Sequence, residues 1–336
     1  MKNRYSLWAL LFGATALPAM AEEVNIYSHR QPELIQPLLD AFTAKTGIDV
    51  NVAFVDKGMV ERLVAEGDRS PADLVLTVDI ARLTQVVEAG VTQAVQSDVL
   101  TAAIPPEFRD VDNKWFGLTA RSRVVYAAKD RVKPGEVTTY EDLADPKWKG
   151  RICTRSGTSD YNIALLGAVI AHDGMDAATA WVKGLKENLA RKPDGGDRDQ
   201  VKAIAAGECD IAIGNTYYIG EMLADPEQKA AAETVNVVFP TFAKGGGSHM
   251  NISGMAMTKA APNHDAALKL MEFLVSDEAQ KIYAETNYEF PIKAGVPVSA
   301  LVASWGAFTP DTLPLAEVAA QRPAALKLME DVDFDG

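Results

Sequence analysis

Cysteine and histidine are scarce in this chain, which has 2 cysteines and 4 histidines among 336 residues. The motifs HExxH, CxxC and GxSxG and the phosphate-binding loop of nucleotide hydrolases are absent. Ser248 and His249 adjoin a glycine run, but adjacent residues do not by themselves make a nucleophile and its base. The sequence therefore predicts a protein that is not an enzyme, and a secreted hydrolase is the weaker alternative.

Positive charge is also in short supply. The chain has 33 Lys and Arg against 46 Asp and Glu, a formal net charge of −13. Phosphate backbones and anionic lipid surfaces repel such a protein, so we expect neither nucleic acid nor an anionic membrane surface as a partner.

Long apolar runs are missing except near the start of the chain. Lys2 and Arg4 precede an apolar stretch over residues 7–17, and residues 19–21 read Ala-Met-Ala, a small-residue cleavage signal. This pattern is typical of a secretory signal peptide, and its apolar part is too short to span a bilayer. We expect removal of residues 1–21, which takes the net charge to −15, and a periplasmic mature chain without stable membrane insertion.

The two cysteines are Cys153 and Cys209. In an oxidising compartment a lone, widely separated pair favours a disulfide over a metal site. Closing a loop of that size would stabilise the fold by roughly 4 kcal/mol in the chain-entropy model. Two buried thiols are the alternative.

Strand-like and helix-like segments alternate from residue 24 onward. Apolar and alternating patterns predict strands at 24–28, 48–55 and 72–79, and helical periodicity predicts helices at 32–45, 59–66 and 80–89. Pro37 allows a kink or a later start in the first of these helices. The alternation is typical of a parallel sheet covered by helices on both faces, so the expected fold class is α/β.

The second half of the chain repeats the pattern. It predicts strands at 124–128, 151–156, 209–215 and 235–242, helices at 161–172 and 176–188, and a capping box at Asp197 and Gln200. The halves have no simple linker, which favours two lobes joined by strands that cross near 121–128 and 237–242. The expected domains are 22–120 with roughly 243–300 as an N-lobe, 121–242 as a C-lobe, and 301–336 as a C-terminal helical segment.

Tyrosines follow two of the predicted strands. Tyr217 and Tyr218 come directly after 209–215, and Tyr161 opens the helix after 151–156. Ligands in open α/β sheets bind at the carboxyl ends of strands, and neighbours on a first helical turn diverge by only about 100°. Phenolate is a hard oxygen donor that suits a trivalent cation such as Fe(III). Ordinary aromatic packing is the alternative role of each tyrosine.

Longer stretches of the chain resemble a known family. The segments YSHRQPELIQPLLDAF (27–42), PADLVLTVDIARL (71–83), GLTARSRVVY (117–126), 148–161 and 195–222, which contains GNTYY, are similar to the periplasmic ferric-ion-binding proteins of ABC iron importers. The resemblance covers nearly all of the mature chain. It implies a type II periplasmic-binding-protein fold with two lobes around a ligand cleft, and it matches Tyr161, Tyr217 and Tyr218 to metal-binding tyrosines.

The first motif departs from many members of that family. Many have a histidine, often followed by a tyrosine, after its arginine, whereas Gln31 and Pro32 stand here. The chain thus resembles the subset that uses three tyrosines and a synergistic anion such as carbonate. The resemblance implies that Arg30 and Gln31, with Arg121 or Arg123, hold this anion, since a guanidinium and a helix N-terminus both favour a carboxylate-shaped ligand. Salt bridges between lobes or at the surface are the alternative roles of the arginines.

The resemblance implies a monomeric periplasmic receptor that binds Fe(III) and delivers it to an inner-membrane ABC permease and its ATPase. Tyr27 is expected to be structural, and His29 lies two places before the family's histidine position. The same fold also carries polyamines, thiamine and organic anions, so a receptor for a small organic molecule is the main alternative. An iron buffer without a transporter is a further one.

Overall fold

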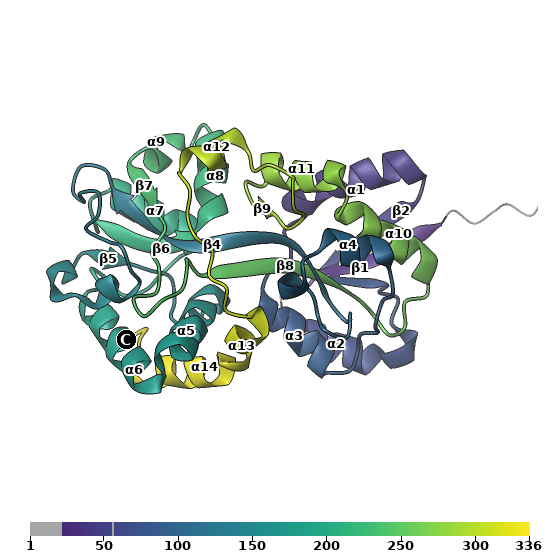
Figure 1. The fold of residues 1–336 in the computed structure, drawn as a ribbon, viewed down its shortest axis with the longest axis horizontal. Coiled ribbons are helices and arrows are strands. Elements are labelled where there is room, and N and C mark those ends of the chain that lie inside the picture. The colour runs from purple at the N-terminus through teal and green to yellow at the C-terminus, as the bar shows by residue number, and fades with distance from the viewer. Residues whose placement is uncertain (1–21, 56) are drawn as a thin grey trace, which may run out of the picture.

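The computed structural model describes residues 22–55 and 57–336, so the predicted signal peptide at 1–21 lies outside the described residues. Two bodies lie side by side, and two long strands run between them (Figure 1). The strands are β1 Glu23–Ser28, β2 Asp49–Phe54, β3 Leu74–Thr77, β4 Phe116–Ala128, β5 Ile152–Cys153, β6 Ile211–Asn215, β7 Val235–Val238, β8 Met250–Met257 and β9 Phe290–Pro291.

Helices cover both faces of the strands in each body (Figure 1). The helices are α1 Pro32–Thr46, α2 Met59–Glu66, α3 Ile80–Glu88, α4 Asp98–Ala103, α5 Asp160–Asp173, α6 Met175–Glu187, α7 Asp197–Ala205, α8 Thr216–Ala224, α9 Lys229–Ala232, α10 His264–Leu274, α11 Asp277–Thr286, α12 Ala300–Ser304, α13 Leu315–Ala320 and α14 Arg322–Asp331. Short 3-10 turns are η1 Gly67–Arg69, η2 Pro106–Phe108, η3 Glu141–Ala144 and η4 Pro146–Trp148.

The strands are hydrogen-bonded in the order β2-β1-β3-β8-β4-β6-β5, and β7 and β9 also pair with β4. β1 is parallel to β2 and β3, and β5 is parallel to β6, whereas β8 is antiparallel to β3 and β4. The first part of β4 pairs with β8 and β9, and its last part pairs with β6 and β7. One strand therefore belongs to the sheets of both bodies.

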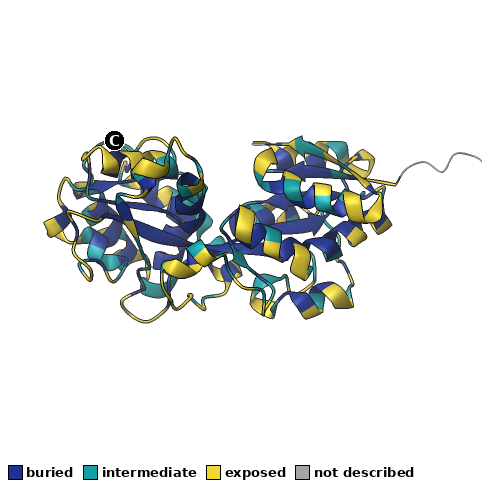
Figure 2. Ribbon diagram, turned by 90° about the horizontal axis from the view of Figure 1, so that it is seen from above, coloured by how far each residue is buried: buried dark blue, intermediate teal, exposed yellow. Residues whose placement is uncertain are grey.

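Each body has its own hydrophobic core. The first core draws on residues 24–120 and 250–292 together with Leu315, and the second on 124–242 and 318–334. Figure 2 shows buried strands inside each body, exposed outer helix faces, and a narrower waist between the two. The C-terminal helix α14 packs against α5 of the second body, whereas α13 packs against both α5 and α3 and so contacts both bodies.

Local sequence signals explain the first body well. The helix α1 buries Ile35, Leu38, Leu39 and Phe42 along one side and runs on through Pro37, so no interruption of the predicted helix occurs. Gly47 ends it in a left-handed conformation with φ 73°, where glycine carries no Cβ penalty.

Two predictions about the second half are wrong. The segment 237–242 does not cross between bodies, because Phe242 still packs in the second core, and the strand that joins the first sheet beside β4 is β8. The capping box lies one residue earlier than predicted. Asp199 accepts from the Gly196 backbone N–H at 2.8 Å, and Asp197 is buried in an ion pair instead.

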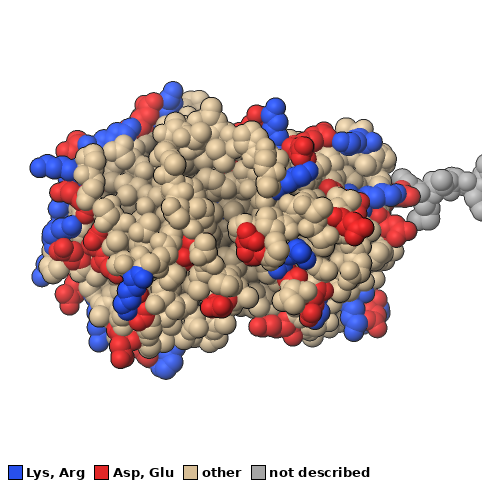
Figure 3. All heavy atoms as spheres, in the orientation of Figure 1, with Lys and Arg blue, Asp and Glu red and all other residues tan. Residues whose placement is uncertain are grey.

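The predicted disulfide is confirmed: Cys153 in β5 is bonded to Cys209, which lies just before β6, and both are buried. Over the described residues, no helix has both the length and the apolar character of a membrane span. On the face seen in Figure 3, acidic and basic side chains are interspersed around the periphery and the middle is mostly uncharged.

Candidate metal centre

A polar cavity of about 380 Å³ lies between the two bodies. The second body contributes Tyr161, Tyr217 and Tyr218, which the structure brings together from the starts of α5 and α8. The first body contributes Arg30 and Gln31 from the start of α1. Five of the seven residues predicted to bind metal or anion thus line one cavity.

The three phenol groups are close neighbours. The hydroxyl oxygens of Tyr161 and Tyr217 are 3.3 Å apart. The rings of Tyr217 and Tyr218 have centroids 4.2 Å apart and are tilted by 39°. Consecutive residues at a strand-to-helix junction therefore present both rings to one place, as predicted for the first turn of α8.

Burial raises the pKa of both tyrosines of the adjacent pair. For Tyr217, loss of solvent is the largest cause, followed by repulsion from Tyr161 and Tyr218, while Arg121 lowers the pKa. The pKa of Tyr218 is raised for the same first reason and by Tyr161, and Arg155 lowers it. Both phenols are therefore neutral near pH 7 until a cation displaces their protons.

Strand β6 fixes the start of α8 through buried contacts. The ring of Tyr126 lies against Gly214, where an added Cβ would come within 2.1 Å of a ring carbon. The Tyr126 hydroxyl donates to the carbonyl of Asn215, the residue two places before Tyr217. Glycine is required at 214 by this close approach rather than by its backbone angles.

Arg123 connects the two tyrosine-bearing segments. Its guanidinium donates to Asp197 at 2.6 Å, to the Asn215 side chain at 3.1 Å and to the Asn162 side chain at 2.8 Å. Asn162 is next to Tyr161 in α5. Arg123 is 2% exposed and is not among the residues that line the cavity, and its guanidinium carbon is 5.6 Å from the centre of the Tyr161 ring.

Tyr161 reaches the cavity after a loop at residues 154–159. Ser159 caps α5 by accepting from the Asn162 backbone N–H. The Asn162 side-chain amide donates to the Thr154 hydroxyl and to the carbonyls of Arg155 and Ser156 at 3.0–3.1 Å. Side-chain hydrogen bonds, and not a strand ladder, therefore set the shape of this loop.

The remaining predicted anion residues differ in their surroundings. Arg30 forms a buried ion pair with Glu289, and Gln31 is exposed at the start of α1. Arg121 is 1% exposed and donates to Ser253, while its Nε and Nη2 have no hydrogen-bond partner. Its guanidinium carbon is 5.9 Å from the centre of the Tyr161 ring.

Several cavity residues were not predicted from the sequence. They are His29, Leu34, Phe54, Val78, Arg82, Arg155, Thr158, Ser159 and Asp160. Arg155 lies 5.0 Å from the centre of the Tyr161 ring, and Arg82 forms an ion pair with Asp160 at 2.7 Å between the two bodies. A basic residue in RICTRS, after a strand and before the tyrosine, was the available signal for Arg155.

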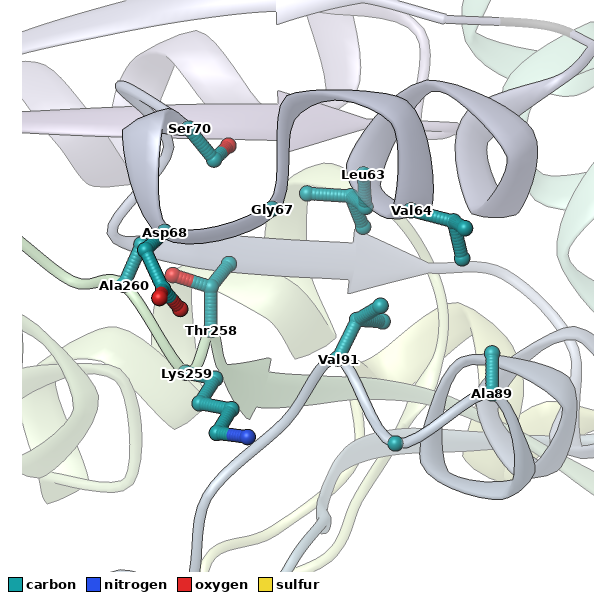
Figure 4. A pocket seen from close by; sticks show the side chains of 11 residues that line it. Leu63, Val64, Gly67, Asp68, Ser70, Ala89, Val91, Thr258, Lys259 and Ala260 are labelled. Atoms are coloured by element: carbon teal, nitrogen blue, oxygen red, sulfur yellow. The ribbon is translucent and has the colours of Figure 1, made fainter.

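In the described part of the chain, His, Cys, Asp and Glu side chains form no second candidate metal site. Over residues 22–55 and 57–336, no group of three or more His, Cys, Asp or Glu could share a metal ion. A second cavity, of about 200 Å³, lies on the first body beside α2 and the residues after β8 (Figure 4). Leu63, Val64, Val91 and Ala260 are among its apolar walls, and Asp68 is its one carboxylate. One carboxylate beside the ammonium of Lys259 is a poor donor set for a ferric ion.

Residues 38–310 match the family model described as bacterial extracellular solute-binding protein. The chain belongs to this family. The predicted type II periplasmic-binding-protein fold is thereby confirmed.

Within the family, the chain is 45% identical to iron uptake protein A1 of Synechocystis sp. over 321 residues, which are 94% of this chain and 89% of that protein. The crystal structure of apo ferric ion-binding protein A from Pasteurella haemolytica is 50% identical, with a TM-score of 0.91, and the match covers 94% of this chain and 99% of that one. A Trichodesmium structure in complex with iron and citrate ligands is 42% identical, with a TM-score of 0.87 and coverage of 93% and 99%. The predicted resemblance to ferric-ion-binding proteins is confirmed, and these relatives are named for binding or uptake and not for catalysis.

Proposed function

We propose that this protein binds Fe(III) through the phenolate oxygens of Tyr161, Tyr217 and Tyr218 and, as a periplasmic monomer, delivers it to an inner-membrane ABC permease and its ATPase. One observation carries the proposal: three phenols from two separate segments meet in a single polar cavity, two of them with hydroxyl oxygens 3.3 Å apart. Three phenolates balance three positive charges, and hard oxygen donors suit a hard trivalent ion.

A synergistic anion such as carbonate would complete the coordination shell. Arg30 and Gln31 line the cavity, and the unpartnered N–H groups of Arg121 lie near Tyr161. A buried donor without a partner is costly, so an anion that accepts from Arg121 is favoured. Arg155 is a further cation for this anion, whereas the bonds of Arg123 assign it to positioning the tyrosines.

The surroundings of Ser248 and His249, the adjacent serine and histidine of the sequence, fit a binding protein better than an enzyme. Ser248 donates its hydroxyl hydrogen to the Pro240 carbonyl at 2.7 Å. His249 is 2% exposed, and burial lowers its pKa to about 3. An occupied hydroxyl beside a deeply buried histidine supports the proposal that the protein is not an enzyme.

We propose that the two bodies are lobes that close over the ligand. They comprise residues 22–120 with roughly 243–300, and residues 121–242, with 301–336 attached to the second lobe. The Arg82–Asp160 ion pair joins the bodies beside Tyr161. A ligand held by residues of both lobes shifts the population toward the closed form, which the permease would recognise.

A ferric complex of a polycarboxylate is the second candidate ligand. Its support is the volume of the cavity, about 380 Å³, together with Arg30, Arg82 and Arg155 among the lining residues. Such a complex would use the same tyrosines and replace carbonate with a larger carboxylate ligand.

A visible absorption titration of the mature protein tests the proposal. Ferric nitrilotriacetate is added in bicarbonate buffer, in citrate buffer and in a buffer free of both. A broad phenolate-to-iron charge-transfer band that saturates at one iron per chain in the wild type, and shifts or disappears in Tyr217→Phe, is the expected result. Absence of the band in all three buffers would overturn iron binding, and a band in citrate alone would favour the polycarboxylate complex.

A further inference from the structure

The last residues of the chain lie against the loop that brings Tyr161 to the cavity. Residues 332–336 (the C-terminal strap) follow α14, and residues 154–159 (the Tyr161 loop) join β5 to α5. The Gly157 backbone N–H donates to one carboxylate oxygen of Asp335 at 2.7 Å. The Ser156 hydroxyl donates to the other at 2.5 Å. One carboxylate thus holds two consecutive residues of the loop.

Packing reinforces these hydrogen bonds. A Cβ on Gly157 would come within 2.6 Å of the Phe334 ring and 3.0 Å of the Met329 sulfur. Phe334 is 2% exposed, so it is a member of the second core and not a loose end. The strap is itself anchored, since the Lys186 ammonium of α6 donates to the carbonyls of Val332 and Asp333.

The other end of α14 also meets this part of the chain. Arg322, the first residue of α14, forms an ion pair at 2.8 Å with Asp160, the residue before Tyr161. The strap therefore contacts the middle of the Tyr161 loop, and Arg322 of α14 contacts Asp160, the residue that follows the loop. Strand β5 has only two residues, Ile152 and Cys153, so the sheet itself gives the loop little support.

We infer that the C-terminal strap positions the Tyr161 loop. Asp335 and Phe334 hold residues 156 and 157 so that Tyr161 and Arg155 reach the cavity. This rests on the proposed function. The strap lines no part of the tyrosine cavity, so it acts through the loop and not on the ligand. Its hydrogen bonds end on an ionised carboxylate, which makes them stronger than bonds between neutral groups.

The variant Asp335→Ala tests the inference in the full mature protein. We expect its affinity for ferric iron, measured by competition with nitrilotriacetate, to fall roughly five- to tenfold, less than the combined strength of the two lost hydrogen bonds, because they act on the ligand only through the loop. Its charge-transfer band should shift, because Tyr161 is no longer held in register with Tyr217. Asp331→Ala is the matched control, since Asp331 ends α14 four positions before Asp335 and its carboxylate accepts from the exposed Lys327 ammonium.

Hydrogen exchange of the iron-free protein gives a readout independent of iron. We expect the amides of residues 155–161 to exchange faster in Asp335→Ala than in the wild type, with the rest of the second body unchanged. Gly157→Ala displaces the strap from the opposite side and should give the same local change. These results would stand even if the wild type bound no iron, in which case the proposed function alone would fail.

Three outcomes would overturn the inference. One is wild-type affinity, band and exchange in Asp335→Ala. Another is a loss of affinity without faster exchange in the loop. The third is faster exchange throughout the second body, which would make the strap a general stabilising contact.

Discussion

The three proposed iron ligands are attached to the protein in two different ways. Tyr217 and Tyr218 follow β6, a strand paired on both sides, and their helix starts directly at the strand end. Tyr161 follows β5, a two-residue strand that ends the sheet order, and a six-residue loop held by Asn162 and Asp335. The adjacent pair follows a strand that is paired on both sides and packed against Tyr126. Tyr161 depends on side-chain hydrogen bonds to its loop, from Asn162 in its own helix and from Asp335 far along the chain.

This difference indicates which substitutions should weaken iron binding. A tyrosine placed by a strand depends on close packing beneath that strand, as between Gly214 and Tyr126. A tyrosine placed by tethers depends on residues that lie far from the cavity. Changes remote from the iron are therefore expected to act through Tyr161 more than through Tyr217 and Tyr218.

Removal of the disulfide should have the largest effect on stability and on the part of the site that carries Tyr161. The variant Cys153→Ala with Cys209→Ala should lose roughly 4 kcal/mol of unfolding free energy, measured by urea denaturation. Its iron affinity should also fall, because β5 then depends on its short pairing with β6. A double-mutant cycle shows whether the loss of affinity acts through Tyr161 or by another route. The loss of affinity should be smaller in a Tyr161→Phe background, and an equal loss in both backgrounds would contradict a route through Tyr161.

Replacement of the tyrosines themselves comes next. Tyr217→Phe should lower ferric affinity by more than about 100-fold, beyond the 10–100-fold range typical of outer-shell partners. Tyr217 is buried and lies within reach of both other phenols, so it contributes to the centre of the donor set. Tyr161→Phe should cause a smaller loss. Competition titrations rank the two, and the reverse order would show that the loop-borne tyrosine is the principal ligand.

The variant Gly214→Ala tests how β6 places Tyr217 and Tyr218. The added methyl would overlap the Tyr126 ring, and we expect a loss of roughly 1–3 kcal/mol in stability, the usual scale of overpacking. Thermal unfolding and the charge-transfer band should both change, because the start of α8 must move. Gly196→Ala is the control, since its methyl would have only an ordinary contact, 3.7 Å from Asp199. An unchanged band in Gly214→Ala would mean that the tyrosine pair does not depend on this packing.

The pH dependence of ferric affinity should show the smallest difference between a tyrosine variant and the wild type. Burial raises the pKa of Tyr217 and Tyr218, so below that pKa each phenol must release a proton when iron binds, and affinity rises with pH. Each released proton contributes about tenfold per pH unit. Titrations between pH 6 and 8, corrected for the competitor, should give a slope smaller by one proton in Tyr218→Phe than in the wild type. An identical slope would indicate that Tyr218 binds as a neutral phenol or not at all.

The alternating helices and strands could be predicted because the sequence of each one carries its own pattern of apolar residues. The helix 59–66 is found where expected, and the tyrosines lie just beyond strands as the sequence indicates. The strand β8 escaped prediction because its alternation of apolar and polar residues covers only Met250 to Ser253, Gly254 follows, and no long apolar run marks it although it is buried along its whole length. The first half of β4 is similar, since Arg121 and Arg123 break its apolar pattern and yet are buried.

The supporting contacts of the site could not be predicted from the sequence. Arg123 meets Asp197, Asn162 and Asn215 only after four separate segments have packed together. Asp335 contacts Gly157 across more than half of the chain. A periodicity or a motif describes neighbours along the sequence, whereas these partners are neighbours only in space.

The place of β8 between β3 and β4 has a consequence for the order in which the protein can be made. Leu74 pairs with Met257, so the first sheet stays open until β8 has been synthesised. The second body draws its sheet from one continuous stretch, but its core also needs residues 318–334 from the end of the chain. We therefore expect neither core to close before these late parts of the chain are available, and closure to be slow, because such distant contacts form late. The cavity between the bodies would then become competent for iron in the final step of folding.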